Sequence, residues 1–552
     1  MPHLLYHQFY DKKNSTTQAI RTTSRVIFAA LTDQGKRSLR AVGELIHRPK
    51  SSVHRHLQAQ ARRNRHPESG FWETEEGEAW LRLLVFAVLY TFGLQHHVGA
   101  GALSDFFQLI RLHTHVGVSP SALQTQLSRM EALLPLFQQQ CEASVPTRTR
   151  QAVVAADETF FGEILILVLM DLSSGYLLLE SIQKDRGFDT WFAQVTPRLE
   201  ALGIEVNHAI SDRAKALIKL AVTGFECTSG ADTFHEQYGL SRWLSPALGR
   251  RKAKADQCCE LAQKALDQPS RGASTEEKAA LAAQQACAWE ARAQVEQAQQ
   301  EYQKQLLGIA EEIHPFSLEE NTRTTAESVV AGLETRAQAL ETLAAQQGIQ
   351  DTRSALKKFR AQIGALSSHV SFWWLWVEEI LLGWSLDEAT RQWLTSKLLP
   401  VLYWHYQMRK TQNRVHRKRY QEAWQRALEA WKADPFHSGF SESELQRWLE
   451  WGEWMVRQFH RSSSAVEGRN GRLSQLYHNG RGLTKCRLAA LTVIHNYGVR
   501  RSDGTIAAER LFSTSFPDLF DWLLNQMGEL PLPRKSRHRV VHNPLKLEIV
   551  PA

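Results

Sequence analysis

The chain has 552 residues, enough for two to four domains, and its 43% hydrophobic and 22% charged residues are those of an ordinary globular protein. The net charge of +8 is unevenly distributed: residues 1–70 contain thirteen Lys/Arg and four acids, and residues 531–552 contain five Lys/Arg and one acid. Basic ends of this kind indicate a polyanionic partner such as nucleic acid, or else a basic surface that keeps the protein soluble. The six cysteines lack C-x-x-C spacing, which argues against a zinc ribbon and a disulfide framework. The sequence also lacks a signal-peptide pattern and an apolar run long enough to span a membrane. These features predict a cytoplasmic protein.

The stretch Arg37–Arg63, RSLRAVGELIHRPKSSVHRHLQAQARR, predicts two short helices joined by a tight turn. Ser38 and Ser51 can cap the two helices, and the HRPK sequence separates them. The apolar positions would face inward: Leu39, Val42, Leu45, Ile46, Val53 and Leu57. The outward positions of the second helix are polar or basic: Lys50, Ser52, His54, Arg55 and Gln58. This pattern favours a DNA-binding helix-turn-helix within residues 1–70 over any other surface helical hairpin.

Residues 71–148 have helical periodicity. They include a weaker second candidate, Gly101–Met130, in which the sequence GVSP forms a turn before a Ser-capped helix. Arg111 and Arg129 are its only strong cations, so a helical connector and a second DNA-binding unit fit equally well.

Strand-like runs define residues 149–244. Three of them cover Ala152–Ala156, Ile164–Asp171 and Tyr176–Ile182, with a Ser-Ser-Gly turn at 173–175. They are followed by a helix over Phe188–Leu202, a strand over Glu205–Ser211 and a helix over Ala214–Val222. Three strands, a helix, a strand and a helix is the order that opens a ribonuclease-H-like fold.

The rest of the chain is predicted to be helical. Residues 245–455 form a large all-helical insertion, with long antiparallel helices broken near 269–274 and 314–316, then a Trp-rich part whose tryptophans are mostly core. A basic run, Arg409–Arg419, fits either a DNA backbone contact or a solvated helix face. Residues 456–530 carry the second part of the α/β domain, and residues 531–552 form a basic, extended tail. The fold class is therefore α+β overall and mostly α.

Three acids occupy notable positions. Asp157 ends the first strand, Asp212 ends the fourth strand, and Glu467 lies at the start of a helix after the insertion. The first and fourth strands of a ribonuclease-H-like sheet are neighbours, so Asp157 and Asp212 would lie side by side. Converging carboxylates repel one another unless divalent cations lie between them, and oxygen ligands suit Mg²⁺ or Mn²⁺. Singly, the three acids also fit a turn residue, a helix cap and a first-turn acid, respectively.

With these motifs the sequence resembles bacterial insertion-sequence transposases of the DDE class. The matching pieces are AADETFFG, ISDRAKALIK, GADTFHEQYGL and SSSAVEGRNGRLSQLYHNGRGL. The resemblance implies that Asp157, Asp212 and Glu467 bind two Mg²⁺ ions. Asp232 and His235 resemble the D-x-x-H motif of hAT-like and Mutator-like transposases, which also carry a helical insertion before the catalytic Glu. The resemblance further implies that the protein binds double-stranded DNA, both the element ends and the target. It also implies a homodimer or larger assembly at the nucleoid.

Some assignments stay open at this point. Glu444, Glu450 and Glu453 lie upstream at helical spacing and compete with Glu467 as the third acid. His235 could orient a phosphate or a metal-bound water, or be a buried hydrogen-bonded histidine. Glu158 should point to the face opposite Asp157 if the strand continues. Cations near Glu467 would screen phosphate charge: Arg461, Arg469, Arg472 and Arg481.

The sequence therefore predicts a DNA transposase that cleaves element ends and joins them to a target by two-metal-ion chemistry. A ribonuclease-H-like nuclease without joining activity and a domesticated DNA-binding regulator are the alternatives.

Overall fold

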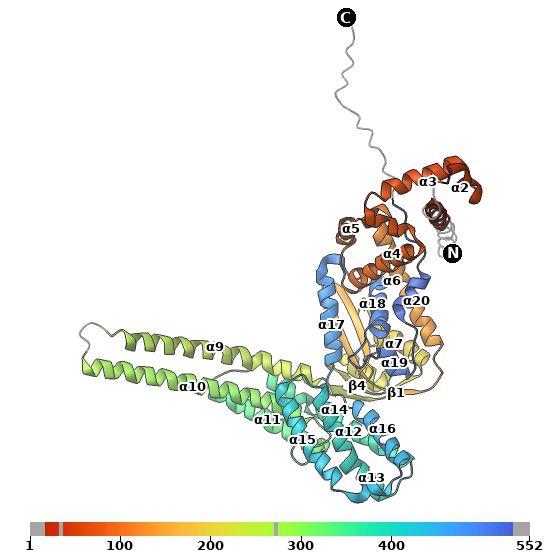
Figure 1. Cartoon of the computed structure of the whole chain (residues 1–552). Coiled ribbons are helices and arrows are strands. Elements are labelled where there is room, and N and C mark those ends of the chain that lie inside the picture. Colours follow the sequence, from red (N-terminus) through yellow and green to blue (C-terminus); the bar gives the residue numbers. More distant parts are fainter. Residues whose placement is uncertain (1–16, 32–36, 270–273, 534–552) are drawn as a thin grey trace. The chain divides into compact units, whose positions relative to one another are not determined.

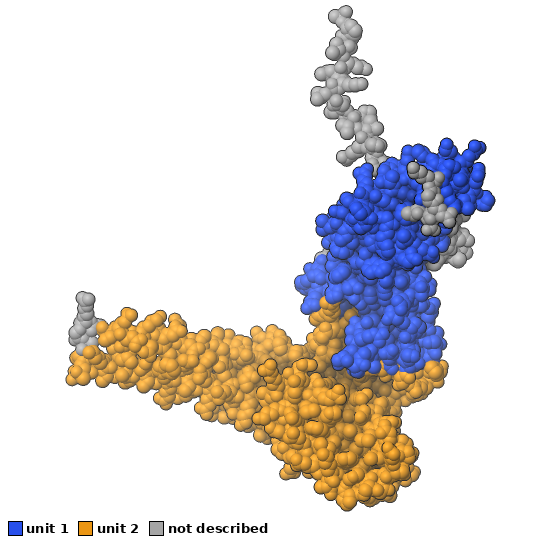
Figure 2. Space-filling view, in the orientation of Figure 1, with its two compact units in different colours: residues 1–145, 473–509, 514–552 blue, residues 146–472, 510–513 orange. Residues whose placement is uncertain are grey.

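A computed structural model describes residues 17–31, 37–269 and 274–533. The chain divides into two compact units (Figure 2). Unit 1 comprises residues 1–145, 473–509 and 514–552, and unit 2 comprises residues 146–472 and 510–513. The two parts of the expected α/β domain, 149–244 and 456–530, are therefore distributed over both units. The predicted basic tail, apart from residues 531–533, lies outside the described residues.

Unit 2 contains one mixed five-stranded sheet of order β3-β2-β1-β4-β5. The strands β1, β2 and β3 are antiparallel neighbours, whereas β4 pairs parallel to β1, and β5 parallel to β4. Their bounds are β1 Arg150–Phe161, β2 Ile164–Asp171, β3 Leu177–Gln183, β4 Ile204–Ser211 and β5 Thr228–Ala231. The predicted first strand is longer than expected and includes Asp157 in its interior, while the expected strand at 164–171 and the turn after it are confirmed.

The crossover from β3 to β4 is helix α7, Phe188–Leu202, with the predicted bounds. Gly203 ends it at φ +63°, and a Cβ there would approach the carbonyl oxygen of Arg148 to 2.7 Å, so both conformation and space require glycine. A short helix, α8 (Lys215–Lys219), and a π-helical turn, η4 (Leu220–Gly224), connect β4 to β5.

The helical part of unit 2 begins directly at the sheet. Helix α9, Thr233–Asp267, starts two residues after β5 and runs beside α10, Thr275–Glu312, as a long hairpin (Figure 1). The boundary expected between residues 244 and 245 falls inside α9. The remaining elements are α11 Ala326–Gln346, α12 Ala355–Gly383, α13 Glu388–Trp393, η5 Leu394–Leu398, α14 Leu399–Lys410, α15 Arg414–Lys432, η6 Pro435–Gly439, α16 Glu442–Arg457 and α17 Ser464–Leu476.

An aromatic core holds this helical part together. Trp373 and Trp404 are fully buried, and Phe316, Tyr403 and Phe459 pack around them with ring centroids 5.0–6.2 Å apart. The expectation that most tryptophans are core holds for six of eleven: Trp373, Trp374, Trp376, Trp393, Trp404 and Trp451. Trp384 and Trp454 are 43% and 40% exposed.

Unit 1 is helical. After a helix over residues 17–31 its elements are α2 Leu39–Leu45, α3 Lys50–Arg63, η1 Pro67–Glu73, α4 Glu75–Val88, η2 Leu89–Gln95, α5 Ala100–Leu109, η3 Leu112–Thr114, α6 Pro120–Ala143, η7 Tyr477–Arg481, α18 Lys485–Gly498 and α20 Leu519–Gln526. A further helix, α19 (Ala507–Phe512), begins in residues of unit 1 and ends in residues of unit 2.

The first three helices form a small core of their own. Ile27, Val42 and Val53 are fully buried together, one from each helix. Ser38 caps α2 as predicted, with its Oγ accepting from the Ala41 N–H at 3.2 Å. Two details were wrong: α3 begins at Lys50 after Pro49 rather than at a Ser51 cap, and Leu45 is 56% exposed rather than inward.

The second candidate for DNA binding, Gly101–Met130, spans α5 and the first half of α6. Ser119 caps α6 as predicted, accepting from the Ala122 N–H at 3.4 Å. Helix α6 continues to Ala143 and buries residues along its length, among them Leu127, Leu134 and Phe137. These buried positions favour the helical connector.

One stretch of the described residues, Glu75–Gln95, is long and apolar enough to cross a membrane. Half of its most apolar window is buried, and Leu81, Val85 and Phe86 are in the core. Packing within unit 1 therefore accounts for part of its apolar character, whereas Trp80, Leu83 and Phe92 are 54%, 40% and 48% exposed.

Candidate functional site

Strand β1 directs its two acids to opposite faces of the sheet, as predicted. Asp157 is 8% exposed, and its Oδ2 accepts from the Nδ2 of Asn470 on α17 at 2.8 Å. Glu158 instead accepts from Trp191 Nε1 on α7 at 3.2 Å and from Arg186 at 3.0 Å. Of the two neighbours, Asp157 belongs to the site described below and Glu158 to the packing of α7.

Asp212 lies beside Asp157 at the level of the backbone. In the parallel β1–β4 pair Ala155 is opposite Ile210, so Asp157 and Asp212 stand at equivalent positions two residues on. Asp212 is exposed, and its Oδ1 accepts from the Ala214 N–H at 2.9 Å, just before α8. The register is the one expected for neighbouring acids, and the bond from Ala214 closes a turn before α8, whose N-cap is Ala214 rather than Asp212.

The segment after β5 adds an acid and a histidine. Asp232 is completely buried and is the N-cap of α9, accepting from the Phe234 N–H at 2.9 Å. Its other oxygen accepts from His235 Nδ1 at 2.8 Å and from the hydroxyl of Ser463. The N–H and hydroxyl of Thr233 donate to the carbonyl of Arg461 at 3.0 and 2.7 Å. The start of α9 is thereby fastened to the segment that precedes α17.

Glu467 reaches the same place from α17. It lies in the first turn of that helix, and its Oε1 is 3.7 Å from His235 Nε2. The competing acids are elsewhere on α16: Glu444 caps its own helix with Ser441, Glu450 accepts from Gln446, and Glu453 pairs with Arg457. Proximity to His235 therefore favours Glu467 as the third acid.

The electrostatics of the cluster are strongly perturbed. Burial raises the pKa of Asp157 to about 7, and the charges of Glu467 and Asp212 add to that effect. The hydrogen bond to Asp232 raises the pKa of His235 to about 9, with the charges of Asp157 and Glu467 contributing. At neutral pH this imidazole is a cation held among carboxylates.

Two members of the cluster were missed by sequence reasoning. Burial raises the pKa of Glu236 to about 7, and the charges of Asp232 and Asp212 act on it too, whereas that of His235 opposes the rise. Asn470 binds Asp157 directly. Both lie within stretches that carry the motifs, but neither residue type is distinctive at its position.

The donor set suits a hard divalent cation. Asp157, Asp212 and Glu467 offer carboxylate oxygens, the ligands that Mg²⁺ and Mn²⁺ prefer, and the mutual repulsion felt at Asp157 is what a bound cation would relieve. Within the part of the chain that the structure describes, no three His, Cys, Asp or Glu side chains converge closely enough to form a metal site as they stand. The three acids thus have the ligand type that Mg²⁺ or Mn²⁺ prefers, but their side chains do not converge on a single metal position.

The expected phosphate-screening arginines are corrected in part. Arg469 is 7% exposed and binds both oxygens of Glu180 at 2.8 and 2.6 Å, so it is a buried structural residue rather than a DNA contact. Arg461 donates to the carbonyls at the end of α10, including that of Ile313 at 3.0 Å, and to Tyr420 at 3.2 Å. Arg472 is half-buried, and the side chain of Arg481 lies outside the described part.

The predicted DNA-reading positions of α3 lie on its surface in unit 1. Lys50, His54, Arg55 and Gln58 are exposed and Ser52 is half-buried, while Val53 turns into the three-helix core. His54 and Gln58 are hydrogen-bonded to each other at 2.9 Å.

The model of a family of unknown function, DUF6399, matches residues 394–539. The matched stretch includes Glu467 and Asn470 but neither Asp157 nor Asp212. No curated protein matches the chain.

Proposed function

We propose that the protein is a DNA transposase of the DDE class, in which Asp157, Asp212 and Glu467 hold the catalytic metal ions. The observation that carries the proposal is proximity of acids far apart in the chain: the β1–β4 register brings Asp157 and the end of β4 to neighbouring positions, and Glu467 Oε1 on α17 is 3.7 Å from His235 Nε2. The strand order β3-β2-β1-β4-β5, with β4 and β5 parallel to β1, is the one expected of a ribonuclease-H-like sheet.

The chain's own residues suggest a division of roles. Mg²⁺ or Mn²⁺ bound at the carboxylates would supply activation of the attacking hydroxyl and stabilise the leaving oxygen. His235, kept protonated by Asp232, supplies a cation beside Glu467 that can hold a phosphate oxygen of the DNA. Asn470 fixes the carboxylate of Asp157, and Asp232 ties α9 to the approach to α17 through Ser463.

DNA binding is proposed for unit 1. Helices α2 and α3, with the helix before them, form a three-helix core, and α3 presents an outward row of polar and basic side chains, as a recognition helix does. We propose that this row reads the element ends, and that a dimer or larger assembly brings two ends together.

Strand transfer tests the catalytic proposal. A duplex with a pre-cut 3′ end, taken from the DNA flanking the gene, is incubated with a supercoiled plasmid and Mg²⁺, and joined products are counted. Asp157→Asn and Glu467→Gln should abolish joining, whereas Glu158→Gln, altered on the opposite face, should retain it. Joining by Asp157→Asn at the wild-type rate would overturn the proposal.

The same assay separates the alternatives. A nuclease without joining activity would cut the duplex in a manner that depends on Asp157 but give no joined product. A regulator would bind the flanking DNA equally well with and without Mg²⁺ and neither cut nor join it.

A further inference from the structure

The turn between α14 and α15 carries a cluster of cations that the proposed catalytic site does not use. Between Glu388 and Glu422 the chain has eight Lys/Arg and no acid. Five of the eight are exposed and fall within ten residues: Arg409, Lys410, Arg414, Arg417 and Lys418. We call these five the α14–α15 basic turn.

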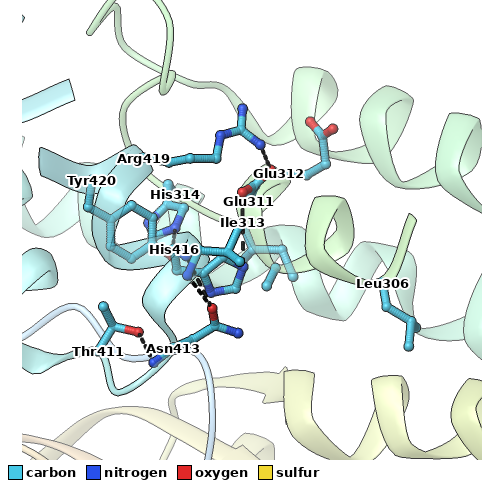
Figure 3. A network of polar contacts seen from close by, with 12 residues as sticks. Leu306, Glu311, Glu312, Ile313, His314, Thr411, Asn413, His416, Arg419 and Tyr420 are labelled. Carbon is cyan, nitrogen blue, oxygen red and sulfur yellow. Dashed lines mark hydrogen bonds and ion pairs between the residues drawn. The ribbon is translucent and has the colours of Figure 1, made fainter. Parts of the chain in front are cut away.

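The side chains of the basic turn differ from that of the neighbouring Arg419. Arg419 pairs with Glu311 (Figure 3). It also pairs with Glu319 at 3.0 Å. Among the described residues no ion pair involves Arg414, Arg417 or Lys418; Arg417 donates only to the carbonyl of Thr411, at 2.8 Å. The chain thus pairs Arg419 with acids, while Arg414, Arg417 and Lys418 face solvent.

The position of these cations is unfavourable in the absence of an anion. Arg414, Arg417 and Lys418 occupy the first turns of the 19-residue helix α15, which has no acid in its first turn. Cations in the first turn of a helix oppose the helix dipole and so carry a free-energy cost. A polyanion lying across the turn would reverse that cost and reduce the repulsion among the five charges.

The basic turn is connected to the acidic cluster through a short segment. The ammonium of Lys410 is 3.5 Å from His460 Nδ1, and three residues later the hydroxyl of Ser463 binds Asp232. Three residues of extended chain span at most about 11 Å, so with side chains included Lys410 lies within roughly 20 Å of Asp232. That is the length of about six nucleotides of one DNA strand.

We propose that the α14–α15 basic turn binds the sugar-phosphate backbone of the DNA on which the acidic cluster acts, with Lys410 within about six nucleotides of the scissile phosphate. The inference rests on the proposed function and extends it: the helical insertion, and not only α3, carries a DNA-binding surface. Backbone contact predicts binding without sequence preference and with a strong dependence on salt.

The test compares two triple variants of the full chain. Arg414, Arg417 and Lys418 are replaced together by Gln; the control replaces Arg353, Lys357 and Lys358, three exposed cations around the start of α12, by Gln. Binding to a random-sequence duplex of about 30 base pairs, long enough to cover several phosphate contacts, is followed by fluorescence anisotropy in EDTA over a series of NaCl concentrations. Circular dichroism checks that each variant is folded.

The salt dependence gives the result. The slope of log K against log [NaCl] should fall by about 0.9 for each phosphate that the protein no longer neutralises, so by about 2–3 in the first variant, and should be unchanged in the control. Equal slopes for wild type and the first variant would overturn the inference without touching the proposed function. Absence of strand transfer by the wild type would overturn the proposed function even if the slope falls. If the first variant does not fold, Lys418→Gln alone should lower the slope by about 0.9, and an unchanged slope there would overturn the inference equally.

Discussion

Arg469 and Glu180 form a buried bidentate ion pair that joins α17 to β3, with N–O distances of 2.8 and 2.6 Å and side chains 6% and 0% exposed. The pair fixes the helix that carries both Glu467 and Asn470 against the sheet that carries Asp157. Its geometry, two parallel hydrogen bonds from a planar guanidinium, is one that lysine cannot reproduce.

Removing one partner of this pair should therefore destabilise the protein strongly. We expect Arg469→Ala to lower the free energy of unfolding by about 3–5 kcal/mol, because Glu180 would be left charged and buried. The double variant Arg469→Met with Glu180→Leu should recover most of that loss, since no charge remains buried. Calorimetric melting temperatures measure both. If Arg469→Ala melts like the wild type and only weakens DNA binding, the side chain is a DNA contact after all.

The contribution of Asp157 to the stability of the metal-free protein should fall as the pH rises from about 4 to 7. The pKa of Asp157 is raised from 3.8 to about 7, so in this range the folded state keeps a proton that the unfolded state releases. Each pH unit in the window then costs up to about 1.4 kcal/mol. Asp157→Asn removes this dependence, because its side-chain oxygen still accepts from Asn470 without carrying charge.

Melting temperatures in EDTA at intervals from about pH 4.5 to about pH 8 provide the measurement. The advantage of Asp157→Asn over the wild type should grow up to about pH 7 and level off above it. Parallel profiles for the two proteins would show that Asp157 is ionised in the fold throughout.

Divalent cations should raise the melting temperature of the protein by binding at Asp157 and not at Glu158. At a Mg²⁺ or Mn²⁺ concentration of about one hundred times the dissociation constant, binding to the folded state alone adds about 2.7 kcal/mol. Asp157→Asn and Glu467→Gln should lose the increase, while Glu158→Gln, whose carboxylate faces Trp191, should keep it. Loss of the increase in Glu158→Gln alone would place the cation on the opposite face of the sheet.

The parts of the fold that local sequence determines were predictable. Alternating and continuous apolar runs identified β1 to β4, and Gly203 marked the end of α7, because these signals act over a few residues. Strand β5 was missed: Thr228–Ala231 is four residues of TSGA, too short and too weakly apolar to give a pattern. Its place at the sheet edge comes from pairing with β4 and packing against α12.

The sequence named the acids of the proposed site but not the contacts around them. Order along the chain selected Asp157, Asp212 and Glu467, but charge alone could not tell a buried arginine from an exposed one. Arg469 and Glu180 are 289 positions apart, and nothing local to either residue reveals the pair. The role of Glu236 likewise depends on burial, which only the packed structure provides.

Replacing Gly230 should be unfavourable because two buried histidines, His208 and His369, pack directly against it. A Cβ at this position would lie 2.3 Å from His369 Cε1 and 2.7 Å from His208 Nε2. Burial lowers the pKa of His369 to about 4 and that of His208 well below its usual value, so both rings are neutral, with one donor and one acceptor nitrogen each. Because His369 Nε2 donates to the Ala231 carbonyl at 2.8 Å, its Nδ1 accepts from His208 Nε2 at 2.9 Å.

Neither ring can move away from an added methyl group without losing a hydrogen bond, and Asp232 follows Ala231 directly. We expect Gly230→Ala to lower the free energy of unfolding by about 1–3 kcal/mol and to reduce strand transfer. Gly249→Ala is the matched control, since a Cβ at that position in α9 has no heavy atom within 4 Å and alanine there should stabilise the helix by about 0.5–1 kcal/mol. Calorimetry and the joining assay measure both effects. A Gly230→Ala protein as stable as the wild type would mean that the histidine pair yields readily and does not hold the start of α9 in place.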